Sequence, residues 1–248
     1  MKEFFSTFYF LLFHIPLSAA TLHAILVGDT VAIGIQDSIK NDIHHMSQEM
    51  KTIESYTDLT LSLITLTGAQ ATTEELRAQV DRMTLQNDDC VLFYFAGHGY
   101  RTPSMGAAYL WPNPFLSYEG VGLNVMALVE LIQAKGPRLL ICMTDCCNNI
   151  LSDAHAPPVS FLRNFSPERA RTNYKILFQE TKGLILATSS KIGRYSYGLS
   201  SGGVYTSLFL EILREETGKE HFFGWRQILD RVGHELDQLQ SPIYTILP

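Results

Sequence analysis

The sequence predicts an α/β fold with a mostly parallel central sheet. After residue 20, apolar runs of strand length alternate with segments of helical periodicity, which is typical of a parallel sheet flanked by helices. The 248 residues, 46% of them hydrophobic, suffice for the core of one compact domain. We therefore expect a single α/β domain.

The first half of that domain contains three predicted strands and two predicted helices. Residues 22–27 are almost continuously apolar, and a helix over 36–53 follows, with Ile39, Ile43, Met46 and Met50 on one face. Residues 57–66 alternate and are rich in β-branched side chains. A second helix then opens at Thr72, whose hydroxyl suits an N-cap. Residues 89–95 are nearly all apolar, as in a central strand that is buried on both faces.

The second half continues the same alternation after an irregular hairpin over 100–114. A third helix over 124–133 ends at Gly136 and Pro137, and residues 138–143 form another apolar strand. Prolines and basic residues interrupt 148–182, which predicts a loop. The remaining predicted elements are a strand over 183–188 and helices over 204–214 and 225–239.

The first twenty residues differ in composition from the rest of the chain. Lys2 precedes an apolar run that is too short to span a bilayer and that ends in small residues. This pattern predicts a signal peptide over 1–20, cleaved after Ala20, with the domain over 21–248 and an exported product. The alternative is an aromatic-rich first strand or helix of the domain. No later stretch is apolar enough to cross a membrane.

Charge and cysteine content exclude several classes of function. The formal net charge of -6 and the pI near 5.7 argue against nucleic acid as a partner. The four cysteines have neither the spacing of a disulfide framework nor that of a zinc site, so we expect no metal and no cofactor. They indicate a reactive thiol, with Cys90 and Cys142 as buried companions.

Two predicted central strands end in residues that carry chemistry. His98 follows the strand over 89–95, and Cys147 follows the strand over 138–143. Because the carboxyl ends of parallel strands meet at one edge of the sheet, both residues are expected there. An imidazole can take the proton of a thiol near neutral pH. Alternatively, His98 is a structural hydrogen-bonding residue and Cys147 a small buried one.

These residues lie in strings that resemble a known family. FYFAGHG, which contains His98, is similar to the histidine segment of caspases and metacaspases, and TDCCN resembles the metacaspase nucleophile segment with Cys147 in the catalytic position. The two residues are 49 positions apart, which fits the family. The strings NDI at 41–43, SSGGVYTSLFLEIL at 200–213 and QSPIYTILP at 240–248 extend the resemblance over nearly the whole domain. It implies a caspase-like three-layer α/β/α sandwich.

The resemblance also implies an activity and roles for particular residues. It makes the chain a cysteine endopeptidase of protein or peptide substrates, with His98 as general base, Cys147 as nucleophile, and the N–H groups of Gly99 and Cys147 as oxyanion donors. Asp145 and Asp42 match acids that line a pocket for Arg or Lys. Family members are often cleaved in the segment after the nucleophile, where Arg163, Arg169 and Lys175 are candidate sites.

Alternatives remain at both the residue level and the protein level. Asp145 could only accept backbone hydrogen bonds at its strand end, and Asp42 could lie on a solvated helix face. Residues 148–150 depart from the His-Ser-Gly that often follows the family's nucleophile. The rival functions are a catalytically silent module that binds a protein partner and an enzyme that hydrolyses amides of small molecules. The segment 200–203 lacks a serine-hydrolase elbow, so we expect it to shape the substrate groove or, through Ser201 or its neighbours, to cap the next helix.

Overall fold

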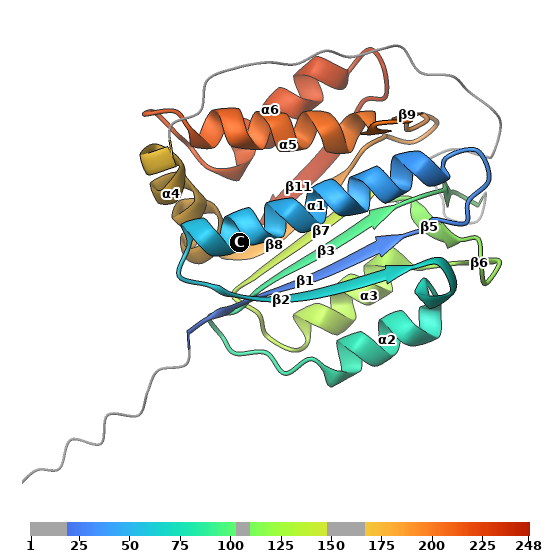
Figure 1. Cartoon of the computed structure of the whole chain (residues 1–248), viewed down its shortest axis with the longest axis horizontal. Helices are drawn as coiled ribbons and strands as arrows, with labels where there is room; N and C mark the ends of the chain where they lie inside the picture. Colours follow the sequence, from blue (N-terminus) through green and yellow to red (C-terminus); the bar gives the residue numbers. More distant parts are fainter. Residues whose placement is uncertain (1–18, 103–109, 148–166) are drawn as a thin grey trace, which may run out of the picture.

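The structure, a computed structural model, describes residues 19–102, 110–147 and 167–248 and has three layers (Figure 1). The middle layer is a six-stranded sheet with the order β11-β8-β7-β3-β1-β2. Its strands are β1 (Thr21–Gly28), β2 (Thr60–Thr67), β3 (Cys90–Ala96), β7 (Leu139–Asp145), β8 (Gly183–Thr188) and β11 (Ile243–Leu247). All neighbours pair in parallel except β11, which is antiparallel to β8. The predicted α/β class and mostly parallel sheet are confirmed.

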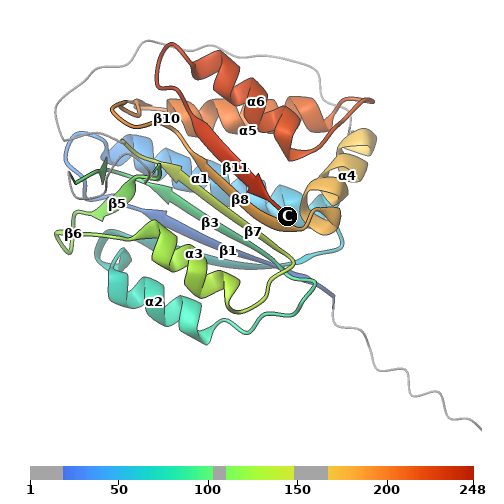
Figure 2. The same cartoon turned by 180° about the vertical axis from the view of Figure 1, so that it is seen from behind.

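Helices cover both faces of the sheet, as Figures 1 and 2 show from opposite sides. One face packs against α1 (Gln36–Tyr56), α4 (Pro167–Lys175), α5 (Val204–Thr217) and α6 (Trp225–Leu236). The other face packs against α2 (Thr73–Arg82) and α3 (Val125–Gln133). The strands β3 and β7 are buried at every position because they lie in the middle of the sheet with helices on both sides, which explains their almost wholly apolar sequences.

Short elements surround the carboxyl end of the parallel strands. The strands β4 (Gly99–Tyr100), β5 (Asn113–Leu116) and β6 (Val121–Gly122) form a small antiparallel sheet. The hairpin of β9 (Gly198–Leu199) and β10 (Gly202–Gly203) precedes α5. The predicted hairpin over 100–114 therefore corresponds to the pairing of β4 with β5, and its residues 103–109 lie outside the described residues.

The predicted loop over 148–182 is wrong in its second half. Residues 167–180 form α4 and the π-helical turn η3 (Ile176–Glu180), although few of their side chains are apolar. Buried contacts of Tyr174 and Phe178 with the core hold this segment, and the side chain of Asn173 donates to the carbonyls of Thr217 and Lys219 at 2.8 and 2.9 Å. Tertiary contacts thus override a weak local preference.

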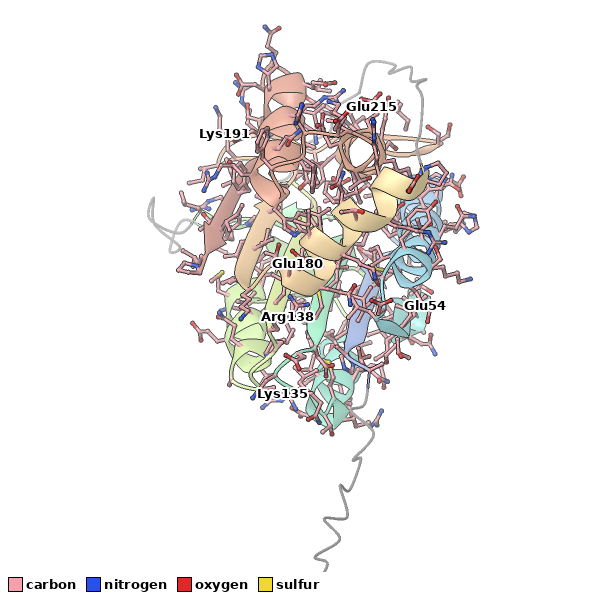
Figure 3. The ribbon with its side chains drawn as sticks, turned by 90° about the vertical axis from the view of Figure 1, so that its left-hand side faces the viewer. Glu54, Lys135, Arg138, Glu180, Lys191 and Glu215 are labelled. Carbon is pink, nitrogen blue, oxygen red and sulfur yellow. The ribbon has the colours of Figure 1, made fainter. Side chains whose placement is uncertain are left out.

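Arg138 fixes the far end of this segment. Its guanidinium donates to the carbonyls of Phe178 and Thr181, at the end of η3. Figure 3 shows α4 lying across this end of the sheet, with Arg138 and Glu180 labelled below it. Two of the predicted cleavage sites, Arg169 and Lys175, lie in α4, and a helical segment does not have the extended conformation of a peptidase substrate. The third, Arg163, lies outside the described residues.

A buried carboxylate joins α1, α4 and α5. Glu49 is fully buried, its Oε2 accepts from the Nε of Arg214 at 2.9 Å, and its Oε1 accepts from the hydroxyl of Tyr174. The Arg214 side chain is itself 47% exposed, but its removal leaves the buried Glu49 carboxylate without its cation. We expect Arg214→Met to lower the free energy of unfolding by about 2 kcal/mol in urea titrations. Glu49→Gln with Arg214→Met should be less destabilised than Arg214→Met alone, and equal stability of the two would contradict this account.

The predicted signal peptide falls almost entirely on residues 1–18, which lie outside the described residues. The described domain begins with β1 directly after Ala20. Within the described ranges, no helix combines the length and the hydropathy needed to cross a bilayer.

Candidate active site

The strands that precede His98 and Cys147 are direct neighbours in the sheet. In the register of β3 and β7, Ala96 lies opposite Asp145, the last residue of β7. The pairing continues beyond the strands, because the N–H of Gly97 donates to the carbonyl of Asp145 at 3.2 Å. The segments that carry His98 and Cys147 therefore leave the same edge of the sheet side by side, as the strand order requires.

Gly99 packs directly against the backbone of Cys147. A Cβ atom at Gly99 would lie 2.4 Å from the Cys147 carbonyl oxygen and 2.6 Å from the Sγ of Cys146, both far inside van der Waals contact. Only glycine fits this approach without displacing backbone. The sequence thus brings the residue after His98 into contact with the residue predicted to be the nucleophile.

The Cys147 thiol is partly buried and is held by Ser196. In the described part of the chain, its Sγ accepts from the Ser196 N–H at 3.4 Å and donates to the Ser196 carbonyl at 3.7 Å. Burial raises the pKa of the Cys147 thiol, and the Ser196 N–H opposes this by lowering it. The thiol is therefore protonated at neutral pH in this conformation, so a nearby base is required for it to act as a nucleophile.

The neighbouring Cys146 has the properties of a core residue. It is 1% exposed, and its carbonyl accepts from the hydroxyls of Ser189 and Ser190 at 3.1 and 3.0 Å. Burial raises the pKa of the Cys146 thiol well above its ordinary value. Cys90 and Cys142 are also buried, with the pKa of each thiol raised to about 12 by burial. Of the four cysteines, Cys147 is the one that is not buried.

The backbone on either side of His98 is fixed by the small antiparallel sheet. The His98 carbonyl accepts from the Phe115 N–H at 2.9 Å, and the next residue pairs with Pro114 of β5. The imidazole itself is half-buried. Asp29 follows β1 at the same edge of the sheet, where burial raises the pKa of its carboxyl and a positive charge on His98 lowers that pKa to a smaller extent.

Asp145 is buried and its two oxygens are both satisfied. Oδ1 accepts from the Ser196 hydroxyl, and Oδ2 accepts from the N–H and the hydroxyl of Thr206, at 3.2 and 2.7 Å, in the first turn of α5. Burial raises the pKa of the Asp145 carboxyl, and these hydrogen bonds lower it. Asp145 thus accepts one backbone hydrogen bond, from Thr206, and two from hydroxyl groups.

Asp42 lies beside Asp145 and is 2% exposed, so the interpretation of Asp42 as part of a solvated helix face is wrong. Its Oδ1 accepts from the Gly203 N–H at 2.7 Å, and a Cβ at Gly203 would meet both carboxyls, at 2.3 Å from Asp145 and 2.9 Å from Asp42. Burial, and then the charge of Asp145, raise the pKa of the Asp42 carboxyl well above its ordinary value.

The two carboxyls also replace the cap that was predicted for the next helix. The N-cap residue of α5 is Gly203, and among the described residues no hydrogen bond joins the hydroxyl of Ser201 or of Ser200 to the N–H groups of this helix, so the predicted serine cap is wrong. Instead, Asp42 and Asp145 bind N–H groups at the start of α5, where the positive end of the helix dipole favours negative charge.

Asp29 and Ser196 were not predicted as site residues. Asp29 follows a parallel strand, and the rule that placed His98 and Cys147 at the carboxyl edge applies to it equally. Ser196 lies in an irregular segment between β8 and β9, and no sequence pattern marks it. Among the described residues, no group of three His, Cys, Asp or Glu side chains is arranged to hold a metal ion.

Comparisons with known proteins agree with this architecture. A family model described as the caspase domain of the C14 peptidases matches residues 24–246. Among solved structures, the crystal structure of protein GSU0716 from Geobacter sulfurreducens superimposes with a TM-score of 0.58, at 12% sequence identity, over 91% of this chain and 92% of that one. At that identity the likeness shows the shared fold alone. No curated protein matches the chain significantly.

Proposed function

This chain belongs to the caspase domain family, and from that premise we propose that it is an endopeptidase with Cys147 as nucleophile and His98 as general base. The observation that carries the proposal is the contact of Gly99 with Cys147, which supports a shared site for the two segments. The membership itself supports a cysteine peptidase that acts on protein substrates.

In the proposed reaction, the Cys147 Sγ attacks the carbonyl carbon of the scissile peptide while His98 accepts the thiol proton. The tetrahedral intermediate collapses as His98 gives that proton to the leaving amine, which produces a thioester. Water, deprotonated by His98, then hydrolyses the thioester and regenerates the thiol. The raised pKa of Cys147 in the resting protein favours proton transfer during attack over a permanent thiolate.

We propose that the N–H groups of Gly99 and Cys147 bind the oxyanion. The close approach of Gly99 to the Cys147 backbone supports this assignment, since two donors must converge on one oxygen. A donor of this kind contributes about 3 to 4 kcal/mol to transition-state stabilisation where one has been removed in other hydrolases.

Asp42 and Asp145 are the proposed acids for a substrate Arg or Lys. Two buried carboxyls side by side, each with a raised pKa, would bind a cation in place of a proton. In the described structure, Asp145 is bonded to Ser196, which also holds the Cys147 thiol. We infer that substrate binding displaces Ser196 from both groups at once.

The specificity proposal predicts a matched pattern of variants. Asp145→Asn is expected to lower kcat/KM for peptides with Arg before the cleaved bond by about 100-fold, because a desolvated charge pair is lost. Asp37→Asn, an exposed acid on the same helix as Asp42, should leave it unchanged. In the wild type, the preference for Arg should weaken with falling pH, beginning above the ordinary aspartate pKa of 3.8 because both pKa values are raised. Strict cleavage after Asp in kinetic assays would contradict the proposal.

A positional peptide library, screened with the wild type and Cys147→Ala in parallel, tests the proposed function. Cleavage by the wild type alone supports an endopeptidase. Binding of a protein partner with no cleavage would instead favour the silent module, and hydrolysis of small amides alone would favour the other rival enzyme.

Two proposals concern parts of the chain outside the described residues. We propose that residues 1–20 are an export signal and that the peptidase domain spans 21–248, which N-terminal sequencing of the mature protein tests. Self-cleavage is proposed at Arg163, because the helical Arg169 and Lys175 are unsuitable. Intact mass after incubation, with Cys147→Ala beside the wild type, tests that site.

A further inference from the structure

At the proposed active-site edge lies a buried carboxyl with one oxygen that no described residue hydrogen-bonds. Asp29 follows β1 and is 1% exposed. Its Oδ2 accepts from the Ser117 hydroxyl at 2.5 Å, but its Oδ1, which is also buried, has no hydrogen-bond partner among the described residues. A buried acceptor without a donor is costly, and such groups in native proteins usually have a specific explanation.

Asp29 packs against the segment that leads to His98. The N–H of Asp29 donates to the carbonyl of Ala96 at 3.0 Å, and a Cβ at Gly97 would lie 2.8 Å from the Asp29 Cβ. Burial raises the pKa of the Asp29 carboxyl, while Ser117 and then the positive charge of His98 lower it. A positive charge on His98 therefore favours the ionised form of the Asp29 carboxyl.

We propose that Asp29 is a positioning residue that orients the His98 imidazole and stabilises the positive charge that His98 acquires when it takes the Cys147 proton. The inference rests on the proposed function, and it adds a third residue to the proposed catalytic pair of Cys147 and His98. A base that must develop charge during attack is commonly oriented by such a third group, and the unpaired Oδ1 is the acceptor available for it.

The other two described acids at this edge, Asp145 and Asp42, accept hydrogen bonds from other residues. Both oxygens of Asp145 accept hydrogen bonds from Ser196 and Thr206, and Asp42 is bonded to Gly203. Asp29 has one electrostatic partner with a resolved effect, His98, and one neutral hydrogen-bond donor, Ser117. Of these three described acids, Asp29 is thus the one with a free buried oxygen, Oδ1, that could accept from the imidazole.

An NMR measurement tests the orientation of the ring without requiring catalysis. In protein labelled with 13C and 15N at the histidine rings, the His98 signals are identified by their loss in His98→Gln. In Asp29→Asn, the chemical shifts of the neutral His98 ring are expected to change, because the acceptor that fixes its orientation and tautomer is gone. Unchanged ring shifts in a folded variant would overturn the inference and leave the proposed peptidase standing.

The reciprocal variant keeps the inference testable if Asp29→Asn does not fold. Because coupling between two groups is mutual, His98→Gln should move the titration of the Asp29 carboxyl carbon to higher pH. An Asp29 titration that is the same in His98→Gln and the wild type would also overturn the inference.

Kinetics separate positioning from a structural role. If the wild type cleaves peptides, Asp29→Asn should lower kcat about 10- to 100-fold with little change in KM, and the acid limb of kcat/KM should move to lower pH. Ser117→Ala, which removes the hydrogen bond to Oδ2 but keeps the carboxylate, should produce a smaller change. A fall in kcat with an unmoved acid limb would contradict positioning. Absence of peptidase activity in the wild type would instead reject the proposed function.

Discussion

Replacing Cys147 with alanine is expected to lower kcat for peptide cleavage by about 10⁴-fold or more, to the level of the uncatalysed background of the assay. When catalytic residues act as a unit, removing one of them lowers kcat about as much as removing all of them. His98→Ala should therefore be comparably inactive. The double variant should be no worse than either single one. Stopped assays with a fluorogenic peptide ending in Arg, together with thermal unfolding of each variant, measure this.

Cys146→Ala is the matched control for that experiment. It removes an adjacent thiol of the same kind, but a buried one whose pKa is raised well above its ordinary value. We expect kcat within about 10-fold of the wild type, with a loss of stability of about 1 kcal/mol from the smaller side chain. If Cys146→Ala were inactive and Cys147→Ala remained active, the nucleophile would have been assigned to the wrong cysteine.

Gly99→Ala is expected to reduce kcat by about 100-fold or more. The new Cβ would lie 2.4 Å from the Cys147 carbonyl oxygen, which is backbone and cannot rotate away, so the two segments must separate. That separation moves both proposed oxyanion donors, and loss of one such donor costs about 10²- to 10³-fold in other hydrolases. The measurement is kcat with a peptide substrate, alongside the free energy of unfolding.

Gly233→Ala is the control for the general effect of replacing a glycine with alanine. Gly233 lies in α6 with open space around its would-be Cβ, so alanine there should raise stability by up to about 1 kcal/mol and leave kcat unchanged. Full activity in Gly99→Ala would contradict the proposed convergence of the two segments.

The sequence was sufficient to predict that His98 and Cys147 follow strands that end at one edge of the sheet. Continuous apolar runs before His98 and Cys147 indicated two central parallel strands, and such strands must present their carboxyl ends together. The structure confirms that β3 and β7 are neighbours. Their adjacency itself was not derivable from the chain order, because β7 follows β3 only after three short strands and a helix.

What sequence patterns missed depends on contacts that are distant along the chain. The helix α4 is strongly polar, and its conformation depends on partners in α1, α5 and the loop after α5. Asp42 reads as a polar position on an amphipathic helix, yet it is buried because the turn before α5 closes over it. Asp29 becomes notable only when the sheet order places it beside the segment of His98, where one of its oxygens has no hydrogen-bond partner in the described part of the chain.

Covalent labelling tests the central claim most directly. A peptidyl-Arg acyloxymethyl ketone forms a thioether with a cysteine nucleophile that a base has activated, and tandem mass spectrometry identifies the modified residue. The account predicts one adduct, on Cys147, with the rate of labelling strongly reduced in His98→Ala. Labelling of a different cysteine, or equal labelling rates with and without the imidazole, would contradict a site in which His98 activates Cys147.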